Sequence, residues 1–462
     1  KKETDETVVA KTEISEAAVV ADSAYFCGVM CDAPTVSYQL PDDACSLEQP
    51  AANCFAWSTF LALNWKCSSK RGIADSTATA ATYGTPGDLG PTVWESYLSE
   101  EEVFTNHGPA AWNTKSFRKG AAYVKKVEML SKIENTLQKV KKSGLKSANN
   151  KVQELFQAQG TWLTDQGGNL VWYEVKMNLE EYDFIVNNQL YDPVKQLSYA
   201  KQNNGIWTPN GSIELKAAWK VVDADSLEAI KPYYKISQAM VPTVTGFDTG
   251  GNPILGEYSK QYLALVGLHI IRKTPLSPQL FWMTFEHVDN APVDGQADPN
   301  KRYSFYNPKS NAVPNQSPVA GTDKLTTPVQ VVRIKANAPD KDIQAINAYC
   351  QNLIRQSNPN SVWQYYELVN VQWPNSPVPD INNNKGITPL ADGSIKPHNI
   401  ANTTMETYAQ GTYCMQCHQY GNASSAAGKN NWATDYSFMF SKAVTQKATP
   451  SKFSGNVGRA KK

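Results

Sequence analysis

The sequence lacks both long apolar runs and a strong net charge. No apolar run approaches the roughly 18 residues of a membrane span, which predicts a chain without a transmembrane segment. The net charge is only +1, and charged residues make up 19% of the 462 residues. No global field therefore favours nucleic acid or a membrane surface as a partner. Hydrophobic residues, at 41%, and aromatic residues, at 10%, are enough for a sizeable core.

An initiating Met and the apolar segment of a signal peptide are also missing, which indicates that a leader was removed or never included. Of the eight cysteines, five lie between Cys27 and Cys67. Such a group is typical of disulfides in an oxidising compartment, although buried free thiols would fit the same pattern. Several pairings are open, and the sequence cannot choose among them. We expect an exported protein, periplasmic or extracellular.

One short motif near the C-terminus carries recognisable chemistry. Cys414 and Cys417 are followed directly by His418, and Cys-x-x-Cys-His is the attachment sequence of a c-type haem. In one helical turn, positions i and i+3 share a face. Both thiols can then bond one porphyrin edge, and His418 becomes the proximal iron ligand. The alternatives are a zinc site, a redox or disulfide-bonded Cys-x-x-Cys, and chance; zinc would need further ligands.

Through this motif the chain resembles the c-type cytochromes. Three further runs, residues 54–65, 265–269 and 284–290, together with the motif resemble a group of exported bacterial monohaem cytochromes of unknown activity. The resemblance implies one covalently attached haem c and export. It implies no particular reaction.

Hydrophobic periodicity divides the chain into four parts. Residues 1–24 read as a mobile N-terminal arm. Residues 25–210 are predicted to be mainly helical and to contain the disulfides, 211–380 to form an antiparallel β-rich core, and 381–462 to form the haem-binding segment. The predicted class is α+β, an antiparallel β-sheet core with packed helices and a C-terminal loop and helix segment carrying the haem.

Individual elements follow from the same patterns. A buried helix of about three turns is expected from Asn53, which would cap it. A second helix is expected at residues 340–356 and helical structure at 152–204. Strands are predicted at 213–219, 233–244, 261–272, 280–289, 329–334 and 362–373.

Residues 115–151 are the most strongly basic part of the chain, with eleven Lys and Arg against two Glu. Apolar residues recur there at helical spacing, which predicts an amphipathic helix with a cationic face. That face is either simply solvated or docks an acidic redox partner or an anionic cell surface. Nucleic acid is not expected, because aromatic residues are not interleaved with the charges.

The role of the iron depends on its sixth ligand. A strong ligand makes an electron carrier, and an open position permits peroxide or oxygen chemistry. Met439 and Met405 are the first candidates and His398 the next, although methionine is more often core packing. For an open position, the expected distal pair is His287 with Glu286. His269 reads as a histidine of the core.

Three functions are consistent with these features. The first is an exported monohaem c-type cytochrome acting in electron transfer. The second is a haem-dependent oxidoreductase, peroxidase-like, in which the large α+β part builds a substrate pocket. The third is a surface binding or structural protein in which the haem only holds the C-terminal segment. Whether the chain is an enzyme is left open.

Overall fold

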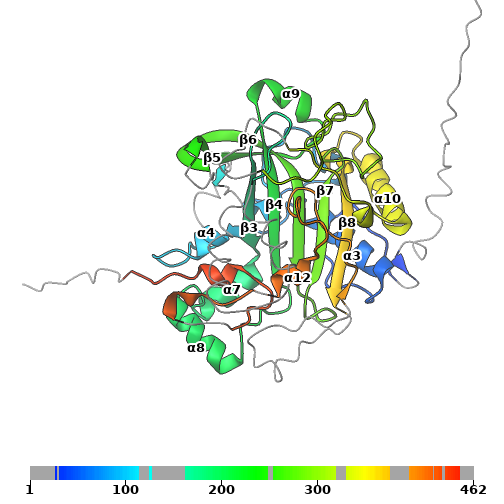
Figure 1. The fold of residues 1–462 in the computed structure, drawn as a ribbon. Coiled ribbons are helices and arrows are strands. Elements are labelled where there is room, and N and C mark those ends of the chain that lie inside the picture. Colours follow the sequence, from blue (N-terminus) through cyan, green and yellow to red (C-terminus); the bar gives the residue numbers. More distant parts are fainter. Residues whose placement is uncertain are drawn as a thin grey trace, which may run out of the picture.

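The computed structural model describes residues 27–28, 31–113, 124–126, 162–247, 253–318, 329–374, 395–419, 421–428 and 432–447. One mixed sheet runs through this part of the chain (Figure 1). Its strands are β1 (Leu98–Ser99), β2 (Val124–Lys126), β3 (Val171–Met177), β4 (Ile213–Val222), β5 (Ile236–Phe247), β6 (Pro253–Arg272), β7 (Phe281–His287), β8 (Tyr366–Pro374) and β9 (Ile395–Lys396). The sheet is antiparallel except where β2 pairs with β5, and with its packed helices it confirms the predicted α+β class.

The long strand β6 is the centre of the sheet. The strand order is β1-β3-β4-β6-β7-β8-β9. Along β6, β4 pairs with residues 262–272, β5 with residues 253–264 and β7 with residues 267–272, all antiparallel. The short strand β2 pairs in parallel with β5. Because β4, β6 and β7 are neighbours, their side chains form continuous rows across the sheet.

The helices cover the sheet and its ends. The α-helices are α3 (Gln49–Leu63), α4 (Glu100–Val103), α7 (Leu179–Asn187), α8 (Pro193–Asn203), α9 (Leu227–Ile230), α10 (Lys341–Ser357) and α12 (Cys414–His418). Short 3-10 turns are η1 (Ala80–Thr82), η2 (Trp94–Ser96), η5 (Ala224–Ser226), η6 (Lys335–Asn337), η7 (Val362–Tyr365), η8 (Ser425–Ala427) and η9 (Met439–Lys442).

Helix α3 is buried along nearly its whole length, as a helix that is apolar on all sides must be. It begins earlier than predicted. Its N-cap is Glu48, and a Pro in the first turn fits there because that N–H needs no helical partner. Asn53 lies inside the helix and accepts a 2.8 Å hydrogen bond from Gln49 Nε2. The prediction of Asn53 as the cap is therefore wrong, and the helix itself is confirmed.

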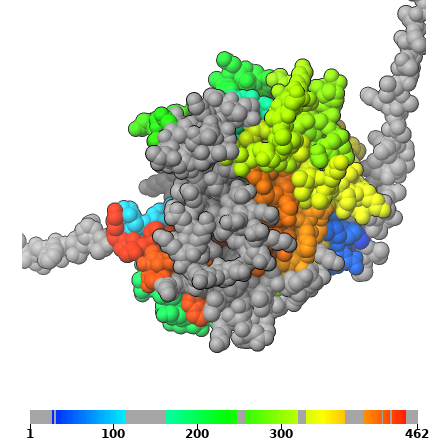
Figure 2. Space-filling view, in the orientation of Figure 1, coloured from blue at the N-terminus to red at the C-terminus, as the bar shows by residue number. Residues whose placement is uncertain are grey.

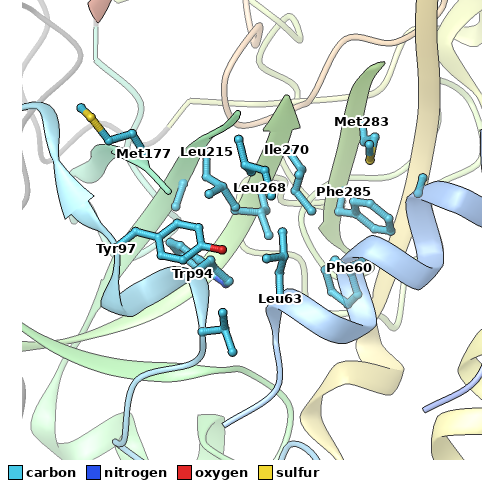
Figure 3. Close-up of a cluster of buried hydrophobic side chains, with 14 of the residues drawn as sticks. Phe60, Leu63, Trp94, Tyr97, Met177, Leu215, Leu268, Ile270, Met283 and Phe285 are labelled. Carbon is cyan, nitrogen blue, oxygen red and sulfur yellow. The ribbon is translucent and has the colours of Figure 1, made fainter. Parts of the chain in front are cut away.

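The main core lies between α3 and one face of the sheet (Figure 3). Phe60 stacks on Phe285 of β7 at 4.3 Å between ring centroids, and Leu268 and Ile270 of β6 belong to the same cluster. Alternate residues of a strand point to opposite faces. Residues 267, 269 and 271 of β6 therefore face the other side of the sheet, where the C-terminal segment packs.

Most strand predictions from residue 213 onwards are confirmed, as β4, β5, β6, β7 and β8 show. The predicted helix at 340–356 is α10. Residues 329–334 do not form a strand; Arg333 makes only an isolated bridge to Val293. Residues 171–177 are predicted to be helical but form β3, because all seven pair with β4 across the sheet, so the helix prediction is wrong there.

The predicted basic helix at 115–151 falls almost entirely outside the described residues. Only Val124–Lys126 of it is described, and these three residues are strand β2, so the helix prediction is wrong there. The remaining residues of that stretch, and the predicted arm at 1–24, lie outside the described part. The expected docking of an acidic partner stays a prediction.

Within the described part of the chain, two disulfides join Cys27 to Cys54 and Cys31 to Cys45. The first ties the N-terminal end of the described chain to helix α3. Cys67 and Cys350 are buried as free thiols, so both patterns considered for the cysteines occur. Disulfides are typical of proteins outside the cytoplasm, which is consistent with an exported protein. Among the described residues, no helix is both long and apolar enough to span a bilayer.

Candidate haem-attachment site

Helix α12 is a single turn that contains the complete motif, Cys414–His418. Met415 is fully buried and anchors the turn in a small apolar cluster with Ile271, Trp282 and Tyr436. The Met415 amide also donates a 3.1 Å hydrogen bond to Gln372 Oε1 on β8. The motif is therefore fixed on the face of the sheet opposite α3. Figure 2 shows that orange residues of this C-terminal part reach the molecular surface.

Cys414 and Cys417 are both free and half-buried, and they are not bonded to each other. At i and i+3 of one turn they share a side of the helix. Burial raises the pKa of the Cys417 thiol to about 12. Burial likewise raises the pKa of Cys414 well above its ordinary value, partly opposed by the hydroxyl of Thr284. Both shifts favour the protonated thiols in the chain without a bound group.

The described residues contain no group of three or more His, Cys, Asp or Glu side chains arranged to hold a metal ion. A structural zinc site needs four such ligands. The motif offers two thiols and one imidazole, which is the donor set for thioether attachment and axial ligation of a haem.

The imidazole of His418 is held in one tautomer. Its Nδ1 lies 2.8 Å from the backbone carbonyl oxygen of Tyr436. A carbonyl only accepts hydrogen bonds, so Nδ1 carries the proton and the lone pair is on Nε2. Burial lowers the pKa of His418 to about 4, which keeps the ring neutral. A neutral imidazole whose second nitrogen donates to a carbonyl is the usual state of a histidine bound to a metal.

Aromatic rings confine the His418 imidazole. Trp282 of β7 lies at 4.6 Å between ring centroids, edge to face, and Phe438 lies at 4.8 Å. These contacts and the hydrogen bond to Tyr436 restrict the ring from different directions. The histidine is thereby oriented before any ligand binds, which lowers the entropy lost on coordination.

The carbonyl of Tyr436 is directed by an unusual backbone. Asp435 and Tyr436 have φ of 52° and 66°, the left-handed region that residues other than glycine rarely adopt. Surrounding contacts hold them there: Lys273 Nζ and Thr208 Oγ1 each lie 2.6 Å from Asp435 Oδ2, and the Tyr436 hydroxyl donates to Gln279. Such conformations persist where neighbouring structure enforces them, often at functional sites.

Gly421 completes the support of this loop. A Cβ at Gly421 would lie 2.9 Å from the Ser437 carbonyl oxygen and 3.0 Å from the Tyr436 carbonyl carbon. These are backbone atoms, so the loop would have to move. A side chain at position 421 therefore cannot coexist with the present placement of the Tyr436 carbonyl.

Glu286 and His287 are adjacent in the sequence, but their side chains do not form one site. Glu286 is paired with Arg333 and accepts hydrogen bonds of 2.9 Å from the amide and hydroxyl of Thr403. As neighbours on a strand, the two side chains point to opposite faces. His287 Nε2 donates a 3.0 Å bond to the Tyr233 carbonyl, and its Nδ1 accepts from Asp289 N. Both of its nitrogens are occupied, and burial lowers its pKa to about 3.

The candidate sixth ligands lie in three different places. Met405 is buried in a cluster with Tyr173 and Val266, and Met439 is buried in the main core. Neither methionine belongs to the cluster around Met415. The exposed ring of His398 stacks at 4.5 Å on Tyr413, the residue that precedes Cys414. Of the three candidates, His398 is the one with a described contact to the residue that precedes α12. The identity of the sixth ligand stays a prediction.

The sheet places further polar residues beside the motif. The sequence alone did not connect these residues with it. Lys216, His269 and Thr284 lie side by side on β4, β6 and β7, and Glu406 reaches His269. His269 was expected to be a core histidine, and it is buried. Only strand register brings these residues together, and no local pattern reveals register between distant strands.

Comparison with known proteins gives no relative. No family model, no curated protein and no solved structure matches the chain.

Proposed function

We propose that the chain carries one covalently attached haem c and acts as an exported electron-transfer protein. The haem would be bonded to Cys414 and Cys417 and ligated by His418. The observation that carries the proposal is the hydrogen bond from His418 Nδ1 to the Tyr436 carbonyl. It leaves the Nε2 lone pair as the ligating atom beside two free thiols of the attachment motif. A bound haem would supply reversible one-electron chemistry.

The chain's own residues have three tasks in this proposal. The turn of α12 presents the two thiols on one side, and Met415 fixes that turn to the sheet. The carbonyl of Tyr436 holds the proton of His418 at Nδ1. Trp282 and Phe438 pack against the imidazole and restrict its plane, which limits rearrangement between redox states.

Electron transfer is preferred to peroxidase-like chemistry because of the state of His287. A distal base needs a free nitrogen within hydrogen-bond reach of the reacting atoms. Both nitrogens of His287 bond to backbone groups, and Glu286 is committed to Arg333 and Thr403. The two disulfides support the proposed periplasmic or extracellular location. The proposed partner is an acidic redox protein that docks on residues 115–151.

The first test is attachment of the cofactor. The chain is exported in a host that matures c-type cytochromes, then denatured and analysed by intact mass and visible absorption. Wild type should retain one haem through denaturation. Replacing both Cys414 and Cys417 by Ala should abolish retention, whereas Cys350→Ala, which removes a free thiol elsewhere, should not. A wild-type chain without added mass would refute the proposal.

The second test separates electron transfer from ligand-activating chemistry. Absorption spectra of the ferric and ferrous protein are recorded before and after addition of cyanide and carbon monoxide. A low-spin iron that does not respond supports an electron carrier. Prompt binding of carbon monoxide would instead support the oxidoreductase, and the electron-transfer role would then be rejected.

A further inference from the structure

A row of polar side chains crosses the sheet on the face that carries α12. In the register of the sheet, Lys216 of β4 is opposite His269 of β6, and His269 is opposite Thr284 of β7. Side chains directly opposite on antiparallel strands have Cβ atoms about 5 Å apart. His269 and Thr284 are buried, and Lys216 is half-buried with its ammonium 5.7 Å from the ring centre of Tyr173.

Glu406 adds a fixed negative charge to this row. Its Oε2 lies 3.4 Å from His269 Nε2 and accepts a 2.8 Å hydrogen bond from the backbone N–H of Asn402. The loop that carries it packs directly on β6, because a Cβ at Gly267 would collide with Thr404 and Asn402. The carboxylate is therefore immobilised, and the His269 and Asn402 contacts lower the pKa of Glu406 despite its burial.

The row lies next to the attachment helix. Cys414 packs against the cluster of Ile271 and Trp282, which are one step along the same face from His269 and Thr284. The charges of Lys216 and Glu406 therefore lie on the same face of the sheet as the attachment helix.

We propose that Glu406 and Lys216 set the reduction potential of the haem with opposite signs, and that His269 holds Glu406 in place for this purpose. The inference rests on the proposed function. Reduction adds one electron to the iron and breaks no bond, so the oxidised state has one more positive charge. A nearby anion stabilises that state and lowers the potential, and a nearby cation raises it. Fixed charges act strongly where burial keeps the effective dielectric constant low.

The test is a spectroscopic redox titration of the purified holoprotein at constant pH and ionic strength, with dithionite as reductant and ferricyanide as oxidant. Glu406→Gln should shift the midpoint potential upwards, and Lys216→Met should shift it downwards. Glu228→Gln and Lys231→Met remove the same charges at an exposed ion pair beside α9, at the far end of the sheet (Figure 1). Both control variants should keep the wild-type potential.

Opposite shifts distinguish a charge effect from a packing effect, because loosened packing would move both variants in one direction. Two shifts of the same sign, or none, would overturn the inference while leaving the proposed function intact. If Glu406→Gln fails to accumulate, Lys216→Met still decides, since an unchanged or raised potential contradicts the assignment. Absence of haem in the wild type would refute the proposed function instead.

Discussion

The backbone carbonyl of Tyr436 accepts a 2.8 Å hydrogen bond from His418 Nδ1, across 18 residues of chain. The acceptor is presented by two consecutive residues with left-handed φ, and their conformation is supported by the Lys273–Asp435 ion pair and by the close approach of Gly421. The orientation of one imidazole therefore depends on a loop that lies outside the motif in the sequence.

Gly421→Ala tests this dependence. The new methyl group would meet the Tyr436 and Ser437 backbone at about 3 Å, so the loop must move and the hydrogen bond to His418 must lengthen. We expect a weaker axial ligand, visible as a shift of the absorption bands towards high spin and easier displacement of His418 by added imidazole. Loss of a supporting partner of a metal ligand typically reduces metal affinity by about 10–100-fold.

Gly411→Ala is the matched control for that variant. Gly411 lies three residues before Cys414, and a Cβ there would meet no atom within 4 Å. Its spectrum should equal that of wild type. A normal spectrum for Gly421→Ala as well would show that the carbonyl of Tyr436 does not govern the histidine.

The methionine candidates can be separated from core packing by substitution with leucine. Met405 and Met439 are 3% and 1% exposed and sit in different apolar clusters. Leucine conserves their volume, so the free energy of unfolding should fall by less than about 1.5 kcal/mol in either variant. Since neither methionine packs in the Met415 cluster, the haem spectrum should also be unchanged. Loss of a low-spin spectrum in one variant would instead identify that methionine as the sixth ligand.

Strands β4, β6 and β7 could be predicted from sequence because each repeats apolar residues over at least seven positions. Neither a loop nor a short helix requires such a repeat. Strand β3 could not. It lies inside the stretch predicted to be helical at residues 152–204, and burial on both faces does not by itself explain the error, because β7 is buried in the same way. The cap of α3 was misplaced because Asn53 is a residue type that commonly caps helices, whereas here it lies within a helix that is buried along nearly its whole length.

The motif residues of the site could be predicted because their spacing is local. The residues that hold the motif in place could not be predicted. Tyr436 contributes its backbone to His418, and any residue type can do that. Its left-handed φ is imposed by contacts of Asp435 with Lys273 and Thr208, which come from distant parts of the chain. Likewise, Glu406 reaches the row beside Cys414 only through the register of three strands.

The ion pair of Lys273 and Asp435 should contribute strongly to stability because it is buried. Its Nζ–Oδ2 distance is 2.6 Å, and the two side chains are 10% and 1% exposed. Lys273→Met leaves the Asp435 carboxylate buried without its cation, which should cost roughly 3–5 kcal/mol. The Lys231–Glu228 pair has the same 2.6 Å distance but side chains 35% and 78% exposed. Lys231→Met should cost less than about 1 kcal/mol.

Urea-induced unfolding of the two variants measures this difference directly. Equal losses of unfolding free energy in Lys273→Met and Lys231→Met would mean that burial does not strengthen the dependence of Asp435 on its partner. The double variant Lys273→Met with Asp435→Asn removes the unpaired charge, so it should recover part of the lost stability.

Glu181 of α7 and Glu214 of β4 give the fold a dependence on pH. Burial, and then repulsion between the two carboxyl groups, raises the pKa of Glu181 well above 4.5, and burial raises that of Glu214 to about 7. The folded state therefore retains protons that the unfolded state has released. Between pH 4.5 and about 7 the unfolded chain binds fewer protons, so the free energy of unfolding falls as the pH rises.

The size of the effect follows from the shift of Glu214. A rise from 4.5 to about 7 at ~1.4 kcal/mol per unit corresponds to about 3 kcal/mol of stability lost between pH 4.5 and 8. Glu214→Gln mimics the protonated form at every pH, so its free energy of unfolding should exceed that of wild type at pH 8 and converge with it near pH 4.5. Urea titrations at pH 5, 6, 7 and 8 measure this, with the exposed Glu228→Gln as control. Parallel curves for wild type and Glu214→Gln would show that the two carboxyl groups ionise without opposing the fold.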